Sequence, residues 1–316
     1  MISPRDGDIT AAAHDYRWLL DRGYPDQGAL KLVGDRYRLS RTGRAVLYRG
    51  VFSARDSRRR SGRLAEVSQR AAGSPGASGA VEADAGDPNA AARGSGAGGK
   101  DAAARGNAGG GARRSPVRGD TPPASEHSGP FIVDGHNVLF TVWNCLAGRP
   151  VVRATDGFIR DIAGTRARLP HDERFTRIAT LLCEALLSLA PPAISVYLDE
   201  QLPWSREHAG EIRELWRVLA QGRPPGASRE VHADARSGSN DATESAVPPP
   251  FTVDTHRSVD GLVAATTEGL IATSDTAVVD RCAVPVLDLG GLIVTVALER
   301  EPPDMAALIA EAARWG

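Results

Sequence analysis

The sequence has little cysteine and no long apolar run. Its three cysteines, Cys145, Cys183 and Cys282, lie far apart, without the paired spacing of a zinc site or a redox couple. Unpaired thiols of this kind are typical of a reducing cytoplasm. No segment approaches the roughly 20 apolar residues of a membrane span, and the first residues contain no apolar signal region. We therefore expect a soluble, cytoplasmic protein that does not act at a membrane.

The chain also lacks an excess of charge of either sign. The 316 residues carry a net charge of −1, so the chain as a whole has no general attraction for polyanions. Lysine is nearly absent, with two residues against 36 arginines, which we attribute to a GC-rich genome rather than to phosphate binding. A P-loop and a Gly-x-Ser-x-Gly elbow are missing as well, so the chemistries that depend on them fit poorly.

Aromatic residues make up only 5% of the chain, so part of it need not fold. Residues 55–128 are dominated by Ala, Gly, Ser, Arg and Pro and show no apolar periodicity. Burial cannot offset the ordering entropy of such a segment, and we predict a disordered linker. A second low-complexity stretch, residues 222–250, is predicted to be an insertion in the domain that follows. We interpret the run Arg58-Arg59-Arg60 as solvated charge.

The N-terminal residues 1–54 predict a small, basic, mainly helical domain. Apolar residues recur at helical spacing from Ala11 to Leu20, and Pro25 opens a second helix. A unit of this size is marginal as an independent fold. We expect it to pack against the main domain or against a second copy of the chain, as in a homodimer.

The remaining residues, 129–316, predict an α/β domain. Four short apolar runs end on or beside an aspartate, and helix-like segments separate them. The alternation predicts a three-layer α/β/α, Rossmann-like parallel sheet. Parallel strands end at one shared edge, where ligands bind, so the aspartates would gather in one cleft. Such a cluster needs a cation, and Mg²⁺ or Mn²⁺ fits it best. The four runs are residues 131–134, 194–199, 270–275 and 284–288.

Val-Asp-Gly-His-Asn at residues 133–137 is the most informative motif. Asp134 ends a strand, and Asn137 can cap the next helix while facing the cleft. A simple turn or cap role for Asp134 is the alternative. The companion aspartates favour metal binding, because clustered carboxylates otherwise raise one another's pKa. For His136 the sequence leaves open a phosphate contact and a hydrogen-bonded structural role.

Three further segments carry candidate residues. Ser274 and Asp275 follow a buried strand and precede a helix, where amides help to hold an anion, although capping alone would explain Ser274. Asp280 lies five positions further on and ranks below Asp275. Asp260 opens a helix, where acids are also common for dipole reasons.

The polar segment 155–161 is the third of these. Asp156 and Asp161 would extend the acidic site, and Arg160 would hold a phosphate oxygen through its planar fork. The alternative is a loop in which Arg160 and Asp161 pair structurally. Asp288, which follows the last run, has no motif around it and is expected to face away from the metal.

Together the motifs at 133–137, 258–261 (Ser-Val-Asp-Gly) and 272–275 (Ala-Thr-Ser-Asp) resemble the NYN branch of the PIN-like nucleases. The resemblance covers roughly residues 130–290 and implies a PIN-like fold. It also implies a set of functional residues, extended here by the candidates above. The expected catalytic residues are Asp134, Asn137, Asp260 and Asp275; the expected metal ligands are Asp134, Asp260 and Asp275, with Asp199 and Asp156 as outer candidates; the expected substrate-binding residues are His136, Arg160 and Ser274.

The whole chain resembles an uncharacterised prokaryotic family, domains of unknown function 434 and 5616. The resemblance rests on Tyr-Arg-Trp-Leu-Leu-Asp-Arg-Gly-Tyr-Pro, followed by Leu-Val-Gly-Asp-Arg-Tyr-Arg-Leu. It implies an architecture and no activity.

These features predict a Mg²⁺- or Mn²⁺-dependent nuclease with RNA as its substrate. Arginines of the N-terminal unit would hold the substrate backbone. Two alternatives stay open: a PIN-like RNA-binding or scaffold protein without turnover, and a small phosphoester hydrolase. The arginines in question are Arg36, Arg38, Arg41, Arg44 and Arg49.

Overall fold

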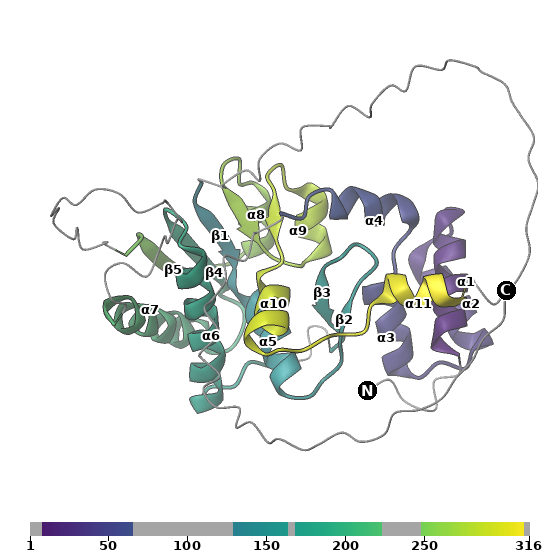
Figure 1. The fold of residues 1–316 in the computed structure, drawn as a ribbon, viewed down its shortest axis with the longest axis horizontal. Coiled ribbons are helices and arrows are strands. Elements are labelled where there is room, and N and C mark those ends of the chain that lie inside the picture. Colours follow the sequence, from purple (N-terminus) through teal and green to yellow (C-terminus); the bar gives the residue numbers. More distant parts are fainter. Residues whose placement is uncertain (1–7, 66–128, 164–167, 223–247, 313–316) are drawn as a thin grey trace, which may run out of the picture. The chain divides into compact units, whose positions relative to one another are not determined.

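The chain folds around a five-stranded parallel sheet with the strand order β5-β4-β1-β6-β7 (Figure 1). The computed structural model describes residues 8–65, 129–163, 168–222 and 248–312. Each of the four predicted apolar runs contributes a strand, so the expected parallel α/β fold is confirmed. The strands are β1 (Phe131–Asp134), β4 (Ile194–Asp199), β5 (Phe251–His256), β6 (Leu270–Ala272) and β7 (Val286–Leu287).

Helices pack on both faces of the sheet, because successive side chains of a strand point to opposite sides. Phe131 and Val133 of β1 join a core with the first set of helices, whereas Ile132 packs into a core with the second set. The arrangement is the expected three layers. The first set is α5 (Gly135–Leu146), α6 (Glu173–Leu189), α7 (Ser205–Gln221) and α10 (Leu289–Leu292), which continues into a π-helical turn (Ile293–Ala297); the second is α8 (Val259–Ala264) and α9 (Thr276–Arg281).

The strand order reverses between β1 and β6. From β1 the chain moves to β4 and β5 on one side, then returns through α8 to β6 on the other side of β1. In open α/β sheets, ligands bind outside the carboxyl ends of the strands at such a switch point. The switch point here lies between the ends of β1 and β6, where Asp134 and Asp275 stand.

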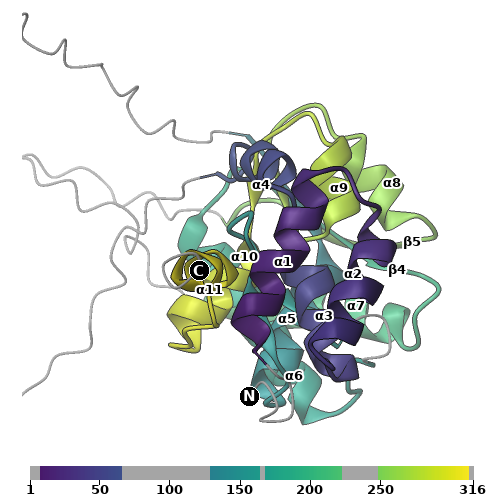
Figure 2. The same ribbon diagram turned by 90° about the vertical axis from the view of Figure 1, so that its right-hand side faces the viewer.

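The N-terminal helices share an apolar core with residues from the main domain. Tyr16 and Leu47 are buried in one cluster with Val152 and with Met305 of α11 (Met305–Ala312), and α11 lies beside α1 (Figure 2). The apolar residues of the small N-terminal unit are therefore buried against residues of the main domain of the same chain. Its helices are α1 (Ile9–Asp21), α2 (Asp26–Arg36), α3 (Arg41–Gly50) and α4 (Ala54–Ser61).

The predicted linker begins too early. Helix α4 occupies its first residues, with the Ser53 hydroxyl capping the helix, and Leu64 then forms a parallel bridge with Val286 of β7. This part of the chain is ordered by contacts with residues more than 200 positions away, which a local compositional argument cannot detect. The other residues of the predicted linker, 66–128, and most of the predicted insertion, 223–247, lie outside the described residues.

A short antiparallel hairpin was not predicted. Strands β2 (Val151–Arg153) and β3 (Ile159–Asp161) pair across a turn in which Gly157 has φ +91°. The turn docks on the end of α3, where Thr155 N–H donates to the Gly50 carbonyl (2.8 Å). The polar segment 155–161, for which a loop was one of the two alternatives, therefore forms part of a hairpin that contacts both the N-terminal helices and the main domain.

Cys183 is fully buried in the core of the main domain. All three cysteines are free thiols. Within the part of the chain that the structure describes, no helix combines the length and the apolar character needed to cross a membrane.

Gly135 is required by helix–strand packing. A Cβ at this position would lie 2.6 Å from Leu198 Cδ2 and 3.0 Å from the Tyr197 carbonyl oxygen. We expect Gly135→Ala to reduce the free energy of unfolding by about 1–3 kcal/mol, through overpacking against β4. Gly210 of α7 has nothing within 4 Å of the same position. Gly210→Ala should therefore stabilise by roughly 0.5–1 kcal/mol. Thermal or urea unfolding compares the two variants, and equal stability would contradict the packing argument.

Candidate functional site

A buried carboxylate marks the centre of the candidate site. Asp134 ends β1, caps α5 and is 4% exposed. Its Oδ2 accepts a hydrogen bond from the Thr273 hydroxyl (2.9 Å), and its Oδ1 accepts one from Asn137 N–H (3.4 Å). Burial raises the pKa of Asp134 to about 7; the Thr273 hydrogen bond opposes the rise, whereas the charges of Asp275 and Asp260 add to it.

Asn137 and Thr273 connect the end of β1 to the loop after β6. Asn137 Oδ1 accepts hydrogen bonds from the backbone N–H (2.7 Å) and the hydroxyl (3.1 Å) of Ser274. Thr273 Oγ1, which donates to Asp134, also accepts from Asp275 N–H (3.1 Å). The loop that carries Asp275 is thereby held against Asp134. Thr273 had no role in the sequence interpretation, although its place at the end of a strand before Ser-Asp was the available indication.

Asp275 and Asp260 lie on the more open side of Asp134. Asp275 Oδ1 accepts from the backbone N–H groups of Ala277 and Val278 and caps α9. Asp260 is exposed in the first turn of α8. Partial burial and the charge of Asp275 raise the pKa of Asp260, Asp199 adds to the rise, and Arg281 opposes it. The expected acids are thus near enough to influence one another electrostatically.

His136 has the structural role of the two that the sequence allowed. Its Nδ1 accepts a hydrogen bond from Asp199 N–H (2.8 Å), and the side chain is 5% exposed. Burial lowers the pKa of His136 to about 4, and the neighbouring His208 contributes. The neutral ring therefore fixes the start of α5 to the end of β4. The Asp199 side chain accepts from Gln201 N–H (2.9 Å), at the rim of the site.

Asp156 and Arg160 form an ion pair beneath the site. The Asp156 side chain is fully buried, and its Oδ1 lies 2.6 Å from Arg160 Nη1. Arg160 Nε donates to the Ser274 carbonyl (2.7 Å), so the guanidinium positions the loop that carries Asp275. Arg160 therefore forms a structural ion pair, as the alternative interpretation of this segment proposed. Its partner is Asp156 and not Asp161, which lies 3.5 Å from Arg49. Arg160 engages Oδ1 of Asp156, and Oδ2 is buried 3.8 Å from Arg60 Nη1, so this carboxylate faces arginines; its role as an outer metal ligand stays a prediction.

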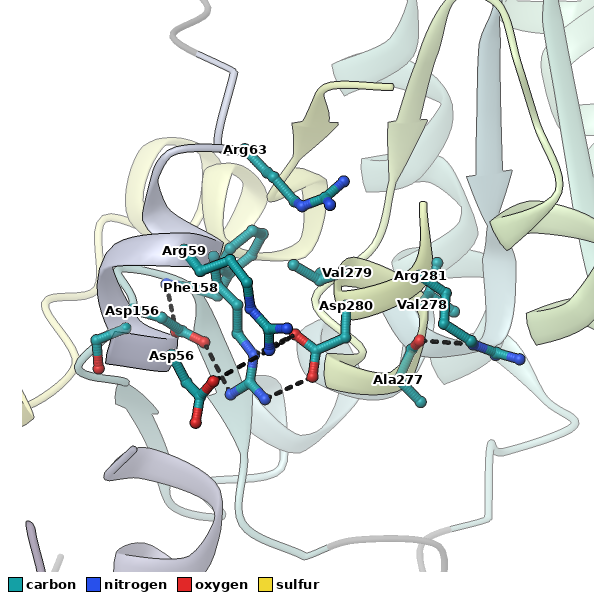
Figure 3. A network of polar contacts seen from close by, with 12 residues as sticks. Asp56, Arg59, Arg63, Asp156, Phe158, Ala277, Val278, Val279, Asp280 and Arg281 are labelled. Carbon is teal, nitrogen blue, oxygen red and sulfur yellow. Dashed lines mark hydrogen bonds and ion pairs between the residues drawn. The ribbon is translucent and has the colours of Figure 1, made fainter. Parts of the chain in front are cut away.

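The arginines of α4 also face carboxylates of the main domain (Figure 3). Arg60 donates twice to Asp280, with both distances 2.7 Å, and Arg59 donates to the same carboxylate (2.9 Å). Burial alone would raise the pKa of Asp280, but hydrogen bonds and charge from Arg60, with Arg59 and Arg160, hold it below its ordinary value. The interpretation of residues 58–60 as solvated charge is therefore wrong for Arg60, which is 8% exposed. Asp280 belongs to this ion-pair network.

Asp288 caps α10. Its oxygens accept hydrogen bonds from the backbone N–H groups of Ile159 (2.6 Å) and Gly291 (2.8 Å). Burial raises its pKa to about 6, although those hydrogen bonds and nearby arginines oppose the rise. Its oxygens are engaged with the hairpin and α10, and the expectation that it faces away from the metal stays a prediction.

The donor groups fit a cation that needs few protein ligands. Among the described residues, no three His, Cys, Asp or Glu side chains come together as a ready-made metal cage. Mg²⁺ does not require one, since it retains several waters and is usually bound by one or two carboxylates together with substrate phosphates. Asp134 and Asp275, joined through Thr273, provide hard oxygen donors of that kind.

The fold and this acidic edge define the class: a parallel α/β protein with carboxylates at its topological switch point. Residues 8–63 match the family model of a protein of unknown function (DUF434), and residues 126–222 match a domain of unknown function (DUF5616). No curated protein and no solved structure matches the chain. The expected similarity to this uncharacterised family is confirmed, whereas the resemblance to the PIN-like nucleases stays a prediction. The second match includes Asp134 and ends before Asp260.

The raised pKa of Asp134 predicts a pH-dependent stability. Between about pH 4 and pH 7 the folded state keeps a proton that the unfolded state has lost, so this residue's contribution to stability falls as the pH rises. Asp134→Asn cannot titrate and still caps α5. In EDTA, we expect the variant to gain stability over the wild type between pH 4 and pH 8, on the order of 2–4 kcal/mol.

Urea unfolding at several pH values measures that difference. Asp254→Asn, an exposed position on β5, is the control and should follow the wild-type profile. A constant difference between Asp134→Asn and the wild type at all pH values would contradict the burial argument.

The two arginines of α4 predict unequal losses of stability. Arg60→Ala removes two hydrogen bonds from Asp280 and a positive charge 3.8 Å from buried Asp156, and we expect a loss of about 2–3 kcal/mol. The Arg59 side chain is 47% exposed, so Arg59→Ala should cost less than about 1 kcal/mol. Denaturant unfolding of both variants tests the order, and an equal cost would place Arg60 in a solvated environment.

Proposed function

We propose that this protein is a divalent-metal-dependent nuclease that hydrolyses phosphodiester bonds, with RNA as its substrate. The proposal rests on one observation: Asp134, a buried carboxylate at the switch point of a parallel sheet, is joined through the Thr273 hydroxyl to the backbone N–H of Asp275. Clustered like charges are costly without a cation, and this cost is a mark of functional sites.

The contacts of the site residues suggest a separate role for each of them in this reaction. Asp134 and Asp275 would hold the ion, and Asn137 and Thr273 keep the two strand ends in register. Mg²⁺ or Mn²⁺ bound there would lower the pKa of a coordinated water and stabilise the leaving oxygen. Asp260 is exposed, and its raised pKa makes it a better proton acceptor than an ordinary aspartate. Asp199 at the rim would orient water.

An RNA-binding protein without turnover is the second candidate, favoured by the lack of a three-ligand cluster in the described residues. A small phosphoester hydrolase is the third. Their products distinguish these candidates from the nuclease. The RNA-binding protein leaves RNA intact, and the phosphoester hydrolase converts mononucleotides while RNA stays intact.

Cleavage of a mixed RNA pool with Mn²⁺ tests the proposal. We expect the wild type to cleave and both Asp134→Asn and Asp275→Asn to lose roughly 100-fold or more of the rate, as is usual when a directly acting group is removed. Chelation with EDTA should abolish cleavage, and added Mn²⁺ should restore it in the wild type alone.

Asp254→Asn again serves as the matched control, since it removes the same charge from an exposed strand position and should cleave as the wild type does. Equal activity in the wild type and Asp134→Asn, or no cleavage with Mn²⁺ present, would remove the nuclease proposal.

A further inference from the structure

A cavity of about 490 Å³ lies between the N-terminal helices and the acidic edge of the sheet. Tyr24 and Tyr48 line it from the N-terminal side, and Arg160 and Asp275 line it from the side of the sheet. Its volume falls within the range of ligand pockets, roughly 300–1,000 Å³. Ser274 and Asp275 line this cavity and also belong to the candidate site, so a ligand in the cavity would lie beside the loop that carries Asp275.

The buried arginines of the cavity are already committed to the protein. Arg60 pairs with Asp280, and Arg160 pairs with Asp156 and with the Ser274 carbonyl. Each keeps one buried nitrogen, Arg60 Nη1 and Arg160 Nη2, that has no hydrogen-bond partner. The two guanidiniums are therefore held in place by the protein, and each has one N–H group without a hydrogen-bond partner.

Arg49 is the accessible cation of the cavity. Its side chain is 31% exposed, its Nη2 lies 3.5 Å from Asp161, and its Nε has no hydrogen-bond partner. Of the other arginines expected to hold a substrate, Arg36 lies 3.7 Å from Asp15, and Arg44 lies 2.9 Å from Asp35. Arg49 is the member of that group that lines the cavity, and its planar fork suits a phosphate oxygen pair.

Two tyrosines give the cavity an aromatic side that is open to solvent. Tyr24 is 49% exposed and Tyr48 is 42% exposed. Exposed aromatic rings beside a cationic group are the elements on which proteins stack the bases of single-stranded nucleic acid. Bases inside a duplex are paired and stacked, so their faces are not available to such rings.

The charges of the cavity distinguish between phosphate ligands. Asp26, Asp56 and Asp275 also line it, and the buried arginines are balanced by aspartates. A nucleoside polyphosphate would bring several negative charges to a cavity whose described lining residues include one accessible cation, Arg49. One nucleotide within a nucleic-acid strand brings a flat neutral base and a single charge, which matches Tyr24, Tyr48 and Arg49.

We propose that this cavity binds one unpaired nucleotide of single-stranded RNA next to the cleaved phosphodiester. The base stacks on Tyr24 and Tyr48, and the adjoining phosphate pairs with Arg49. The choice of RNA rests on the proposed function. The N-terminal helices then contribute directly to substrate binding, and the ion pairs of α4 keep the aromatic side in place opposite Asp275.

Fluorescence anisotropy with a labelled single-stranded RNA of mixed sequence tests this proposal. The full chain carries Asp134→Asn in Mg²⁺, so that the RNA is not consumed. Tyr48→Ala is expected to weaken binding about fivefold to 100-fold, the equivalent of one lost stacking contact. Tyr24→Ala and Arg49→Ala should each weaken it about tenfold, and duplex RNA of the same sequence should bind at least about tenfold more weakly than the single strand.

Two matched controls come from the same helical unit. Trp18→Ala removes an aromatic ring that is 46% exposed, and Arg55→Ala removes an exposed arginine of α4; neither residue lines the cavity. Both should bind RNA as the parent does, and unfolding curves for every variant separate lost binding from lost folding.

The outcomes separate this proposal from the proposed function. Lost RNA binding in the Tyr24, Tyr48 and Arg49 variants supports the cavity even if the wild type cleaves nothing. Unchanged binding in folded forms of these variants overturns it even if the wild type cleaves RNA. Absence of RNA binding by the parent, or equal affinity for single-stranded and duplex RNA, overturns it as well.

Discussion

The burial of one carboxylate at the end of the central strand shapes this protein. Asp134 is removed from water between β1 and β6, and an isolated charge there would be costly. Hydrogen bonds from the Thr273 hydroxyl and the Asn137 backbone N–H reduce this cost. The part of the desolvation cost that they do not offset raises the pKa of Asp134. Thr273 Oγ1 also accepts a hydrogen bond from Asp275 N–H, which holds Asp275 nearby. The hydroxyl that hydrogen-bonds Asp134 therefore also brings a second carboxylate, Asp275, to the same edge of the sheet.

A second layer of ion pairs joins this edge to the N-terminal helices. Arg160 connects buried Asp156 to the Ser274 carbonyl, and Arg60 connects α4 to Asp280. Both guanidiniums are bound on more than one side, so they act as spacers between the helices and the strand ends. Both arginines line the cavity beside Asp275, and the N-terminal helices share an apolar core with residues of the main domain.

Much of the fold follows from local patterns in the sequence. The apolar runs at 131–134 and 194–199 are too short and too β-branched for helices, and they became β1 and β4. The position of Asp134 at a strand end followed from the same pattern. The hairpin at 151–161 could not be predicted, because its polar residues are stabilised by contacts with Gly50 and Asp288 rather than by neighbours in the chain.

The sequence alone determined the parallel α/β class and the strand ends that carry Asp134 and Asp275, since hydrophobic periodicity acts over a few residues. Only the tertiary structure decided what each acid faces. In the sequence, Asp156 is an outer metal candidate and Asp280 ranks below Asp275, but neither position reveals that these acids meet arginines; Arg60 and Asp280 are 220 positions apart. Partners so distant are brought together by the order of the strands and by the shared core. An ion pair of this kind therefore leaves no local pattern to read.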